Sequence, residues 1–160
     1  MKTPNRRGRT MPSDATKEQL QREVTPELYG RIRELWKQHS MAEDGRDIPG
    51  LIATLTPDCV YEVPQLKTEW RGHAGATRFY TELLTAFPDA QFALQNIVIG
   101  PQGVCEEAVL TASAEADWLG LQATGRKVAF PVVIFFPWDP SKQLFRGERV
   151  YFDADALRAS

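Results

Sequence analysis

The stretch 128-VAFPVVIFFPWDPSKQLFRGERVYFD-153 decides the fold class of this 160-residue chain. Residues 128–138 contain no charge and are rich in the β-branched and aromatic residues that favour strands. The segment 139-DPSK-142 has the composition of a tight turn, and the chain then returns through residues 144–152. We therefore predict two antiparallel strands. In the first of them apolar side chains occupy both faces, so both faces must be covered.

Two further strands are predicted before this pair. The first covers residues 92–99, the segment 100-GPQG-103 turns the chain, and the second runs from residue 104 to about residue 117. Small side chains dominate one face of the second strand, which reads Glu106, Ala108, Leu110, Ala112, Ala114 and Ala116. They leave room that either bulky helix residues such as Trp36 and Phe79 or a bound ligand could fill.

The first half of the chain begins with a strong helix signal. Thr25 can cap the helix, Pro26 fits its first position, and the apolar residues keep helical spacing to about Ala42. The inward face comprises Leu28, Ile32, Leu35, Trp36 and His39. His39 is therefore expected to point into the interior with the apolar side chains.

Two more helices and a short strand complete the pattern. Asp47 is expected to cap a short helix to about Leu55, and 56-TPD-58 turns the chain into a strand over residues 59–63. A third helix follows Gly72 and ends at Phe87. Helices come first and antiparallel strands last, which predicts an α+β fold.

The domain organisation follows from where the apolar residues lie. Residues 25–160 form one expected domain, whereas residues 1–24 have charge and Pro, Gly and Ser but no apolar run. We expect that tail to be disordered or loosely attached.

The composition argues against several classes of function. A net charge of −2 is unfavourable for a nucleic-acid surface, and no stretch approaches the roughly 20 apolar residues of a membrane helix. Two distant cysteines, Cys59 and Cys105, form no disulfide framework, so we expect a cytoplasmic protein with reduced thiols. Two histidines without a partner three or four residues away predict no metal site. No glycine-rich phosphate loop or nucleophile elbow is present, and we expect no cofactor.

The outward face of residues 128–138 predicts a partner. Ala129, Pro131, Val133 and Phe135 share this face, and the polar tail cannot shield them. We therefore expect a homodimer formed through this face of the sheet.

Four segments carry a family resemblance: 55-LTPDCVYEVP-64, 71-RGHAGATRFYTELLTAFPD-89, 119-LGLQATGRKV-128 and 147-GERVYFD-153. Together they resemble the SnoaL-like polyketide cyclase family, within the superfamily of nuclear transport factor two and ketosteroid isomerase. The resemblance covers roughly residues 26–153. It implies a curved, mainly antiparallel sheet wrapped around helices into a cone, with an apolar mouth that binds small molecules, usually in a dimer.

The resemblance also implies polar catalytic positions, and three of them are apolar here. Val63 stands where the isomerase branch has a carboxylate base. Ile134 stands where an acid usually lies in the strand before the last, and Ala114 stands where cyclase-like sequences often have a His. None of these side chains can hold a proton, so neither parent reaction can proceed unchanged.

Glu148 and His39 remain as candidate catalytic residues. Glu148 shares a face with Val150 and Phe152, and burial among apolar neighbours would raise its pKa into the range of a general acid or base. The alternative for Glu148 is an ion pair with Arg146 or Arg126. The alternative for His39 is a core histidine bonded to a backbone carbonyl.

The remaining candidates are walls of an apolar pocket, although core packing explains them equally well. The expected ligand-binding residues are Trp36, Tyr61, Val63, Ala114, Trp118, Ile134 and Phe152. The hypothesis is that the protein binds or converts a small hydrophobic molecule by cofactor-free acid/base chemistry of the isomerase, cyclase or hydrolase type. The alternative is a non-catalytic binding module or a purely structural dimer.

Overall fold

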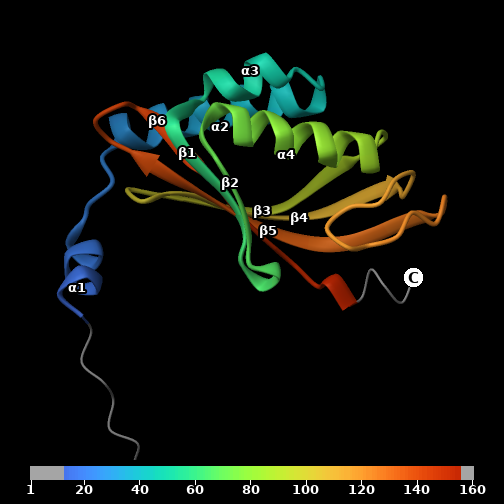
Figure 1. The fold of residues 1–160 in the computed structure, drawn as a ribbon. Helices are drawn as coiled ribbons and strands as arrows, with labels where there is room; N and C mark the ends of the chain where they lie inside the picture. Colours follow the sequence, from blue (N-terminus) through green and yellow to red (C-terminus); the bar gives the residue numbers. More distant parts are fainter. Residues whose placement is uncertain (1–12, 156–160) are drawn as a thin grey trace, which may run out of the picture.

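The computed structural model describes residues 13–155 as a curved six-stranded sheet with three helices on its concave side (Figure 1). The helices are α1 (Asp14–Gln21), α2 (Pro26–Asp44), α3 (Ile48–Ala53) and α4 (Gly72–Ala86), with a 3-10 turn at Pro64–Leu66. The strands are β1 (Leu55–Val63), β2 (Thr68–Arg71), β3 (Gln91–Gly100), β4 (Gly103–Ser113), β5 (Lys127–Asp139) and β6 (Leu144–Phe152). The sheet does not close into a barrel, and this open cone confirms the predicted α+β fold.

The helices begin where the capping residues predict. Thr25 Oγ1 accepts the Leu28 backbone N–H at 3.2 Å, and Asp47 Oδ1 accepts that of Gly50 at 3.0 Å. Helix α2 buries Ile32 and His39 completely, which confirms the inward face expected from the spacing. None of the helices in the described part of the chain is long and apolar enough to cross a membrane.

The strand order β2-β1-β6-β5-β4-β3 brings the two ends of the domain together. Strand β6 lies between β5, to which it is antiparallel, and β1, to which it is parallel. In the β1–β6 register Tyr61 is the partner of Glu148. The parallel pairing thus places Tyr61 of β1 beside Glu148 of β6, inside the cone.

The two faces of β5 differ as the alternation predicts. Its inward residues are all buried, namely Val128, Phe130, Val132, Ile134 and Phe136. On the convex face Ala129, Pro131 and Val133 are exposed and Phe135 is partly buried. The small inward side chains of β4, such as Ala108 and Ala112, are also buried beneath the helices.

Three local predictions were wrong. The segment 56-TPD-58 is part of β1 and not a turn, although the pairing with β6 shifts register between Leu55 and Val60. Strand β4 ends at Ser113, because residues 114–126 form a loop that an isolated bridge between Trp118 and Leu121 closes. The short strand β2 was not predicted.

The expected N-terminal tail is only partly described. Residues 1–12 lie outside the described residues, so their disorder stays a prediction. Helix α1 follows, capped by Ser13, and it buries none of its residues. Its last turn contacts the domain where the Gln102 side chain donates to the Gln19 carbonyl at 3.0 Å.

Replacing Gly147 by Ala tests the close approach of β1 and β6. Gly147 has a φ of +111°, and a Cβ there would lie 2.0 Å from the Val60 carbonyl oxygen. We expect Gly147→Ala to lower the free energy of unfolding by roughly 3 kcal/mol or more. The matched control is Gly30→Ala, which meets no atom within 4 Å in helix α2. It should instead stabilise by about 0.5–1 kcal/mol, and equal effects in chemical denaturation would contradict the prediction.

Candidate functional site

A buried carboxylate, Glu148, lies at the centre of the cone. Its residue is 3% exposed, and its Oε1 atom is within hydrogen-bond distance of three groups. Tyr61 and Tyr80 donate their hydroxyl hydrogens to Oε1 at 3.0 and 2.5 Å, and His39 Nε2 lies 2.9 Å away. Glu148 and His39 are therefore in direct contact although 109 positions separate them.

Four elements converge to build this cluster. Helix α2 contributes His39, β1 contributes Tyr61, α4 contributes Tyr80 and β6 contributes Glu148. The two tyrosine hydroxyls are 2.8 Å apart, and Tyr80 OH is also 2.8 Å from His39 Nε2. All four residues are nearly inaccessible to solvent, so the positions of their polar atoms are fixed by the packing of the whole cone.

The hydrogen bond to Thr54 sets the protonation of the His39 ring. Thr54 Oγ1 donates to the Leu51 carbonyl at 2.7 Å, which uses its only hydrogen. His39 Nδ1 lies 2.6 Å from the same oxygen and must be the donor in that contact. The Nε2 atom of His39 therefore faces Glu148 Oε1. A proton on Nε2 makes this contact an ion pair, whereas a proton on Oε1 makes it a neutral hydrogen bond.

Burial keeps both phenols of the cluster neutral. It is the largest cause that raises the pKa of Tyr61 and of Tyr80 well above the ordinary tyrosine value. The charge of Glu148 raises both values further, because a phenolate beside a carboxylate is repelled. Both hydroxyls therefore remain hydrogen-bond donors to Glu148 Oε1 across the physiological pH range.

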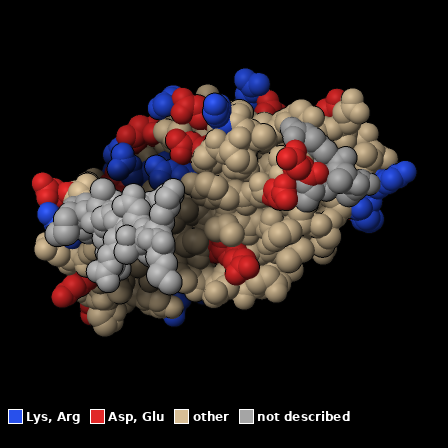
Figure 2. All heavy atoms as spheres, turned by 90° about the horizontal axis from the view of Figure 1, so that it is seen from below, with Lys and Arg blue, Asp and Glu red and all other residues tan. Residues whose placement is uncertain are grey.

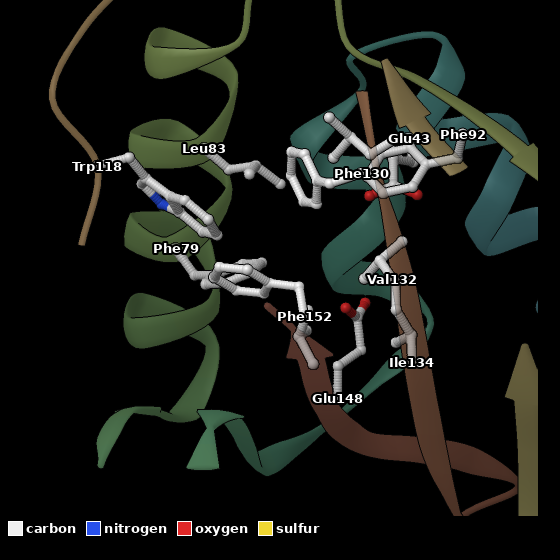
Figure 3. A pocket seen from close by; sticks show the side chains of 12 residues that line it. Glu43, Phe79, Leu83, Phe92, Trp118, Phe130, Val132, Ile134, Glu148 and Phe152 are labelled. Carbon is white, nitrogen blue, oxygen red and sulfur yellow. The ribbon is translucent and has the colours of Figure 1, made fainter. Parts of the chain in front are cut away.

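Glu148 also lines an apolar cavity. No residue among 13–155 donates a hydrogen bond to Oε2, and Glu148 is one of the residues that line the cavity (Figure 3). The other lining residues are Glu43, Phe79, Leu83, Phe92, Leu110, Trp118, Phe130, Val132, Ile134, Val150 and Phe152. The free volume is about 20 Å³, which holds about one water molecule. The Trp118 and Phe152 rings stack at 5.5 Å and close part of the wall.

A second chamber of about 160 Å³ adjoins this cavity and shares Glu43 and Phe92 with it. Its other lining residues are Trp36, Ser40, Asp44, Leu94, Glu106 and Ala108. Trp36 Nε1 donates to Glu106 Oε2 at 2.7 Å. We call this space the acidic chamber, since three of its eight lining residues are carboxylic acids.

Two carboxylic acids of the acidic chamber, Glu106 and Glu43, are hard to ionise. Burial raises the pKa of Glu106 to about 7, opposed by the hydrogen bond from Trp36 and assisted by the charge of Glu148. The pKa of Glu43 is raised well above its ordinary value, first by burial and then by the charges of Glu148 and Glu106. Near neutral pH these side chains are therefore wholly or partly protonated.

The predicted ligand-binding residues divide into three groups. Trp118, Ile134 and Phe152 line the inner cavity, and Trp36 lines the acidic chamber. Tyr61 is directed at Glu148 and does not line the cavity, and Val63 is a fully buried core residue beside it. Ala114 begins the loop of residues 114–126 and lines a separate small cavity together with Trp118.

Three polar residues of the site were not among the predicted site residues. Glu43 is four positions after His39 and therefore on the same helix face, so the helical spacing could have predicted that it points inward. Glu106 was placed on the inward face of β4 and Tyr80 on the inward face of α4, but neither was given a role. The alternative partners Arg146 and Arg126 are not those that Glu148 has here, which are His39 and two tyrosines. No group of His, Cys, Asp and Glu within residues 13–155 is arranged to hold a metal ion.

Comparisons with known proteins agree with this geometry. The SnoaL-like domain family matches residues 36–139. A structure of a proposed SnoaL-like polyketide cyclase from Jannaschia sp. CCS1 has a TM-score of 0.74 at 20% identity, covering 87% of this chain and 99% of that one. AclR, a proposed hydroxylase from Streptomyces galilaeus, has a TM-score of 0.67 at 21% identity, and the match covers 82% of this chain and 95% of AclR. TerC, co-crystallised with polyporic acid, has a TM-score of 0.66 at 18% identity, and the match covers 81% of this chain and 99% of TerC. No curated protein matches the chain.

The Glu106 carboxyl should make stability depend on pH. Its pKa is about 7 in the folded protein against 4.5 for an ordinary Glu, so the folded state holds the proton more tightly. The stabilising contribution is therefore fully present below about pH 4.5 and is lost as the pH rises through about 7. Relative to Glu106→Gln, the wild type should lose roughly 3 kcal/mol of unfolding free energy over that range.

Chemical denaturation at a series of pH values measures this difference. Gln keeps an acceptor for Trp36 Nε1 and cannot ionise, so the variant isolates the titration. The control is Glu107→Gln, which changes the exposed neighbour on the opposite face of β4. Parallel curves for the wild type and Glu106→Gln would show that Glu106 ionises normally.

Proposed function

The chain belongs to the SnoaL-like domain family, whose fold binds or converts small molecules, and we propose that it moves a proton on a small, largely apolar molecule bound in the cone. Glu148 takes and returns this proton, and no cofactor takes part. The supporting observation is the unequal environment of its two oxygens. Three groups hold Oε1, whereas no described residue donates to Oε2, and Glu148 lines the apolar cavity.

The hydrogen bonds to Oε1 orient the carboxylate for this work. Tyr61 and Tyr80 remain donors because their pKa values are raised, and His39 is fixed in turn by Thr54. The carboxylate therefore cannot rotate without breaking several buried hydrogen bonds. A base held in one orientation within an apolar cavity needs little reorganisation when it receives a proton.

The chemistry can be written for an apolar ketone. A C–H bond beside the carbonyl breaks, its electron pair moves into the enolate, and Glu148 Oε2 takes the proton. Return of the proton to another carbon gives isomerisation, and return to the same carbon gives exchange. For Oε2 to accept this proton, the proton of the contact between Glu148 and His39 must lie on Nε2, so that Glu148 begins as a carboxylate and ends as a neutral acid.

Side chains must move before such a ligand can enter. The free space of about 20 Å³ is far smaller than a bicyclic ketone. Trp118 is the wall residue placed for this movement, since it belongs to the loop of residues 114–126, with Leu119 and Gly120 at positive φ. Outward movement of Trp118 from Phe152 would join the ligand space to the surface.

Hydrogen–deuterium exchange of 2-tetralone in D2O tests the proton transfer without knowledge of the natural substrate. Proton NMR follows loss of the hydrogens beside the carbonyl. We expect the wild type to accelerate the loss and Glu148→Gln to reduce this acceleration by about 100-fold, because an amide cannot take the proton. Glu107→Gln, an exposed change on the convex face, should behave as the wild type.

Equal acceleration by the wild type and Glu148→Gln would remove Glu148 from the mechanism. Circular dichroism and the unfolding midpoint of the variant show whether its fold is intact. If the wild type fails to accelerate exchange of 2-tetralone or related apolar ketones, the second candidate is favoured.

The second candidate is a non-catalytic module that binds a small apolar molecule. It is supported by Val63, Ile134 and Ala114, which are buried apolar residues where the family resemblance implies groups that transfer protons. Native mass spectrometry of the purified protein distinguishes the two. A retained molecule that leaves unchanged after incubation favours binding, whereas its conversion favours catalysis.

We further propose that the convex face of the sheet pairs with a second copy of the chain. The face seen from below has a largely uncharged region between the grey segments, with acidic side chains at its border (Figure 2). Val98, Val133 and Tyr151 are exposed there by 62%, 38% and 43%. Apolar exposure of this kind is typical of an interface in a homodimer.

Val133→Glu tests the proposed dimer, because it puts a charge at the middle of the face without disturbing the interior. Analytical ultracentrifugation should show a dimer for the wild type and a monomer for the variant at the same concentration. Lys37→Glu, an exposed change on helix α2, is the control for added negative charge. A monomeric wild type at tens of micromolar would contradict the proposal.

A further inference from the structure

The acidic chamber is a separate space with its own chemistry. It holds about 160 Å³, eight times the volume of the inner cavity at about 20 Å³, and Trp36 and Leu94 are among the residues that line it. The proton transfer proposed above uses none of its residues. Its size is sufficient for a small polar group attached to an apolar molecule.

The residues that line the two spaces carry charge of one sign only. Glu43, Asp44, Glu106 and Glu148 line one or both of them, and neither set contains Lys or Arg. Arg46 is the nearest cation that acts on Glu43, but its guanidinium donates to the Pro88 and Ala90 carbonyls. The potential in the acidic chamber therefore favours a cation.

Several carboxyl oxygens of this chamber take no hydrogen bond from the described residues, so a bound group can donate to them. Glu106 is only 6% exposed, yet among residues 13–155 only Trp36 Nε1 donates to it, at Oε2. No described residue donates to either oxygen of Glu43, which lines both spaces. Among the described residues, the fully enclosed polar side-chain atoms without a partner are those of Thr56, Trp118 and Trp138, so the oxygens of Glu106 and Glu43 can be reached from the chamber.

We propose that the acidic chamber binds the protonated amine of a ligand whose apolar body extends past Glu43 and Phe92 into the inner cavity. This inference rests on the proposed function, since it names the class of molecule on which Glu148 acts. The ammonium group donates to Glu106 Oε1 and to Glu43, and it lies beside the indole of Trp36. The two carboxyl groups that enter the inner cavity, Glu43 and Glu148, point into it from different sides (Figure 3).

Protonation distinguishes an amine from a neutral ligand. In the empty chamber Glu106 holds a proton near neutral pH, and a bound ammonium group favours its carboxylate. Binding of the amine therefore releases a proton from the protein. The other charged groups that act on Glu106 and Glu43 are Asp44, Glu148 and Arg46. The two acids favour a cation, and the Arg46 guanidinium opposes it from its place at the Pro88 and Ala90 carbonyls.

Isothermal titration calorimetry with three matched probes tests the proposal: 2-phenylethylamine, 2-phenylethanol and 3-phenylpropionate. At pH 7.5 we expect the amine to bind at least about tenfold more tightly than the alcohol, and the carboxylate not to bind detectably. Titrations in buffers of different ionisation enthalpy should show release of a proton when the amine binds at pH 7.

Two variants locate the site. Glu106→Gln should weaken binding of the amine about tenfold or more and abolish the release of the proton, with little effect on the alcohol. Glu107→Gln changes the neighbouring exposed residue and should leave all three affinities unchanged. Glu43→Gln is a second test that does not depend on the Trp36 contact, and it should also weaken the amine.

Three results would overturn the inference: equal or tighter binding of the alcohol, no binding of the amine, or undiminished binding of the amine by Glu106→Gln. Its failure is separate from that of the proposed function. Exchange of 2-tetralone that depends on Glu148, without amine binding, would leave the proton transfer in place and remove only the amine. Amine binding without exchange of 2-tetralone would leave the amine site in place and remove the proton transfer.

Discussion

Burial of the Glu148 carboxylate is the constraint on which the rest of the structure depends. A carboxylate in an apolar interior is destabilising by several kcal/mol unless hydrogen bonds replace its water. Here Tyr61, Tyr80 and His39 supply these contacts, all on the same oxygen. The helices and strands that carry them must therefore keep their relative positions, and Gly147 allows β1 and β6 to approach closely enough.

The arrangement favours activity over stability. An apolar side chain in place of Glu148 would need no hydrogen-bonding partners. Hydrogen bonds from the protein to both oxygens of Glu148 would likewise make the fold more stable. Instead no described residue donates to Oε2, Glu148 lines an apolar cavity, and Glu43 and Glu106 lie nearby with raised pKa values. Clustered acids that are hard to ionise are typical of sites that bind or move protons and cations.

The sequence predicted most of the fold because its signals are local. Alternation and turn residues placed the last four strands within a few residues, whereas Pro57 in β1 looked like a turn and the charged four-residue strand β2 gave no pattern. In the site, the periodicity directed His39 and Glu148 inward, but it could not show that Tyr61 would bond to Glu148. That contact depends on the parallel register of β1 and β6, which residues distant in the sequence determine. Glu43 was missed because acids on a helix are usually exposed.

Nitrogen-15 NMR of the His39 ring tests the account most directly, because the protonation of that ring follows from the contacts around Glu148. Thr54 can only accept from Nδ1, so Nδ1 must carry a hydrogen, while Nε2 faces Glu148 Oε1. Two-bond correlations to the ring carbons should therefore show a protonated Nδ1 in the wild type, with Nε2 the atom that changes in Glu148→Gln. A bare Nδ1, or a His39 spectrum that Glu148→Gln leaves unchanged, would contradict the proposed arrangement.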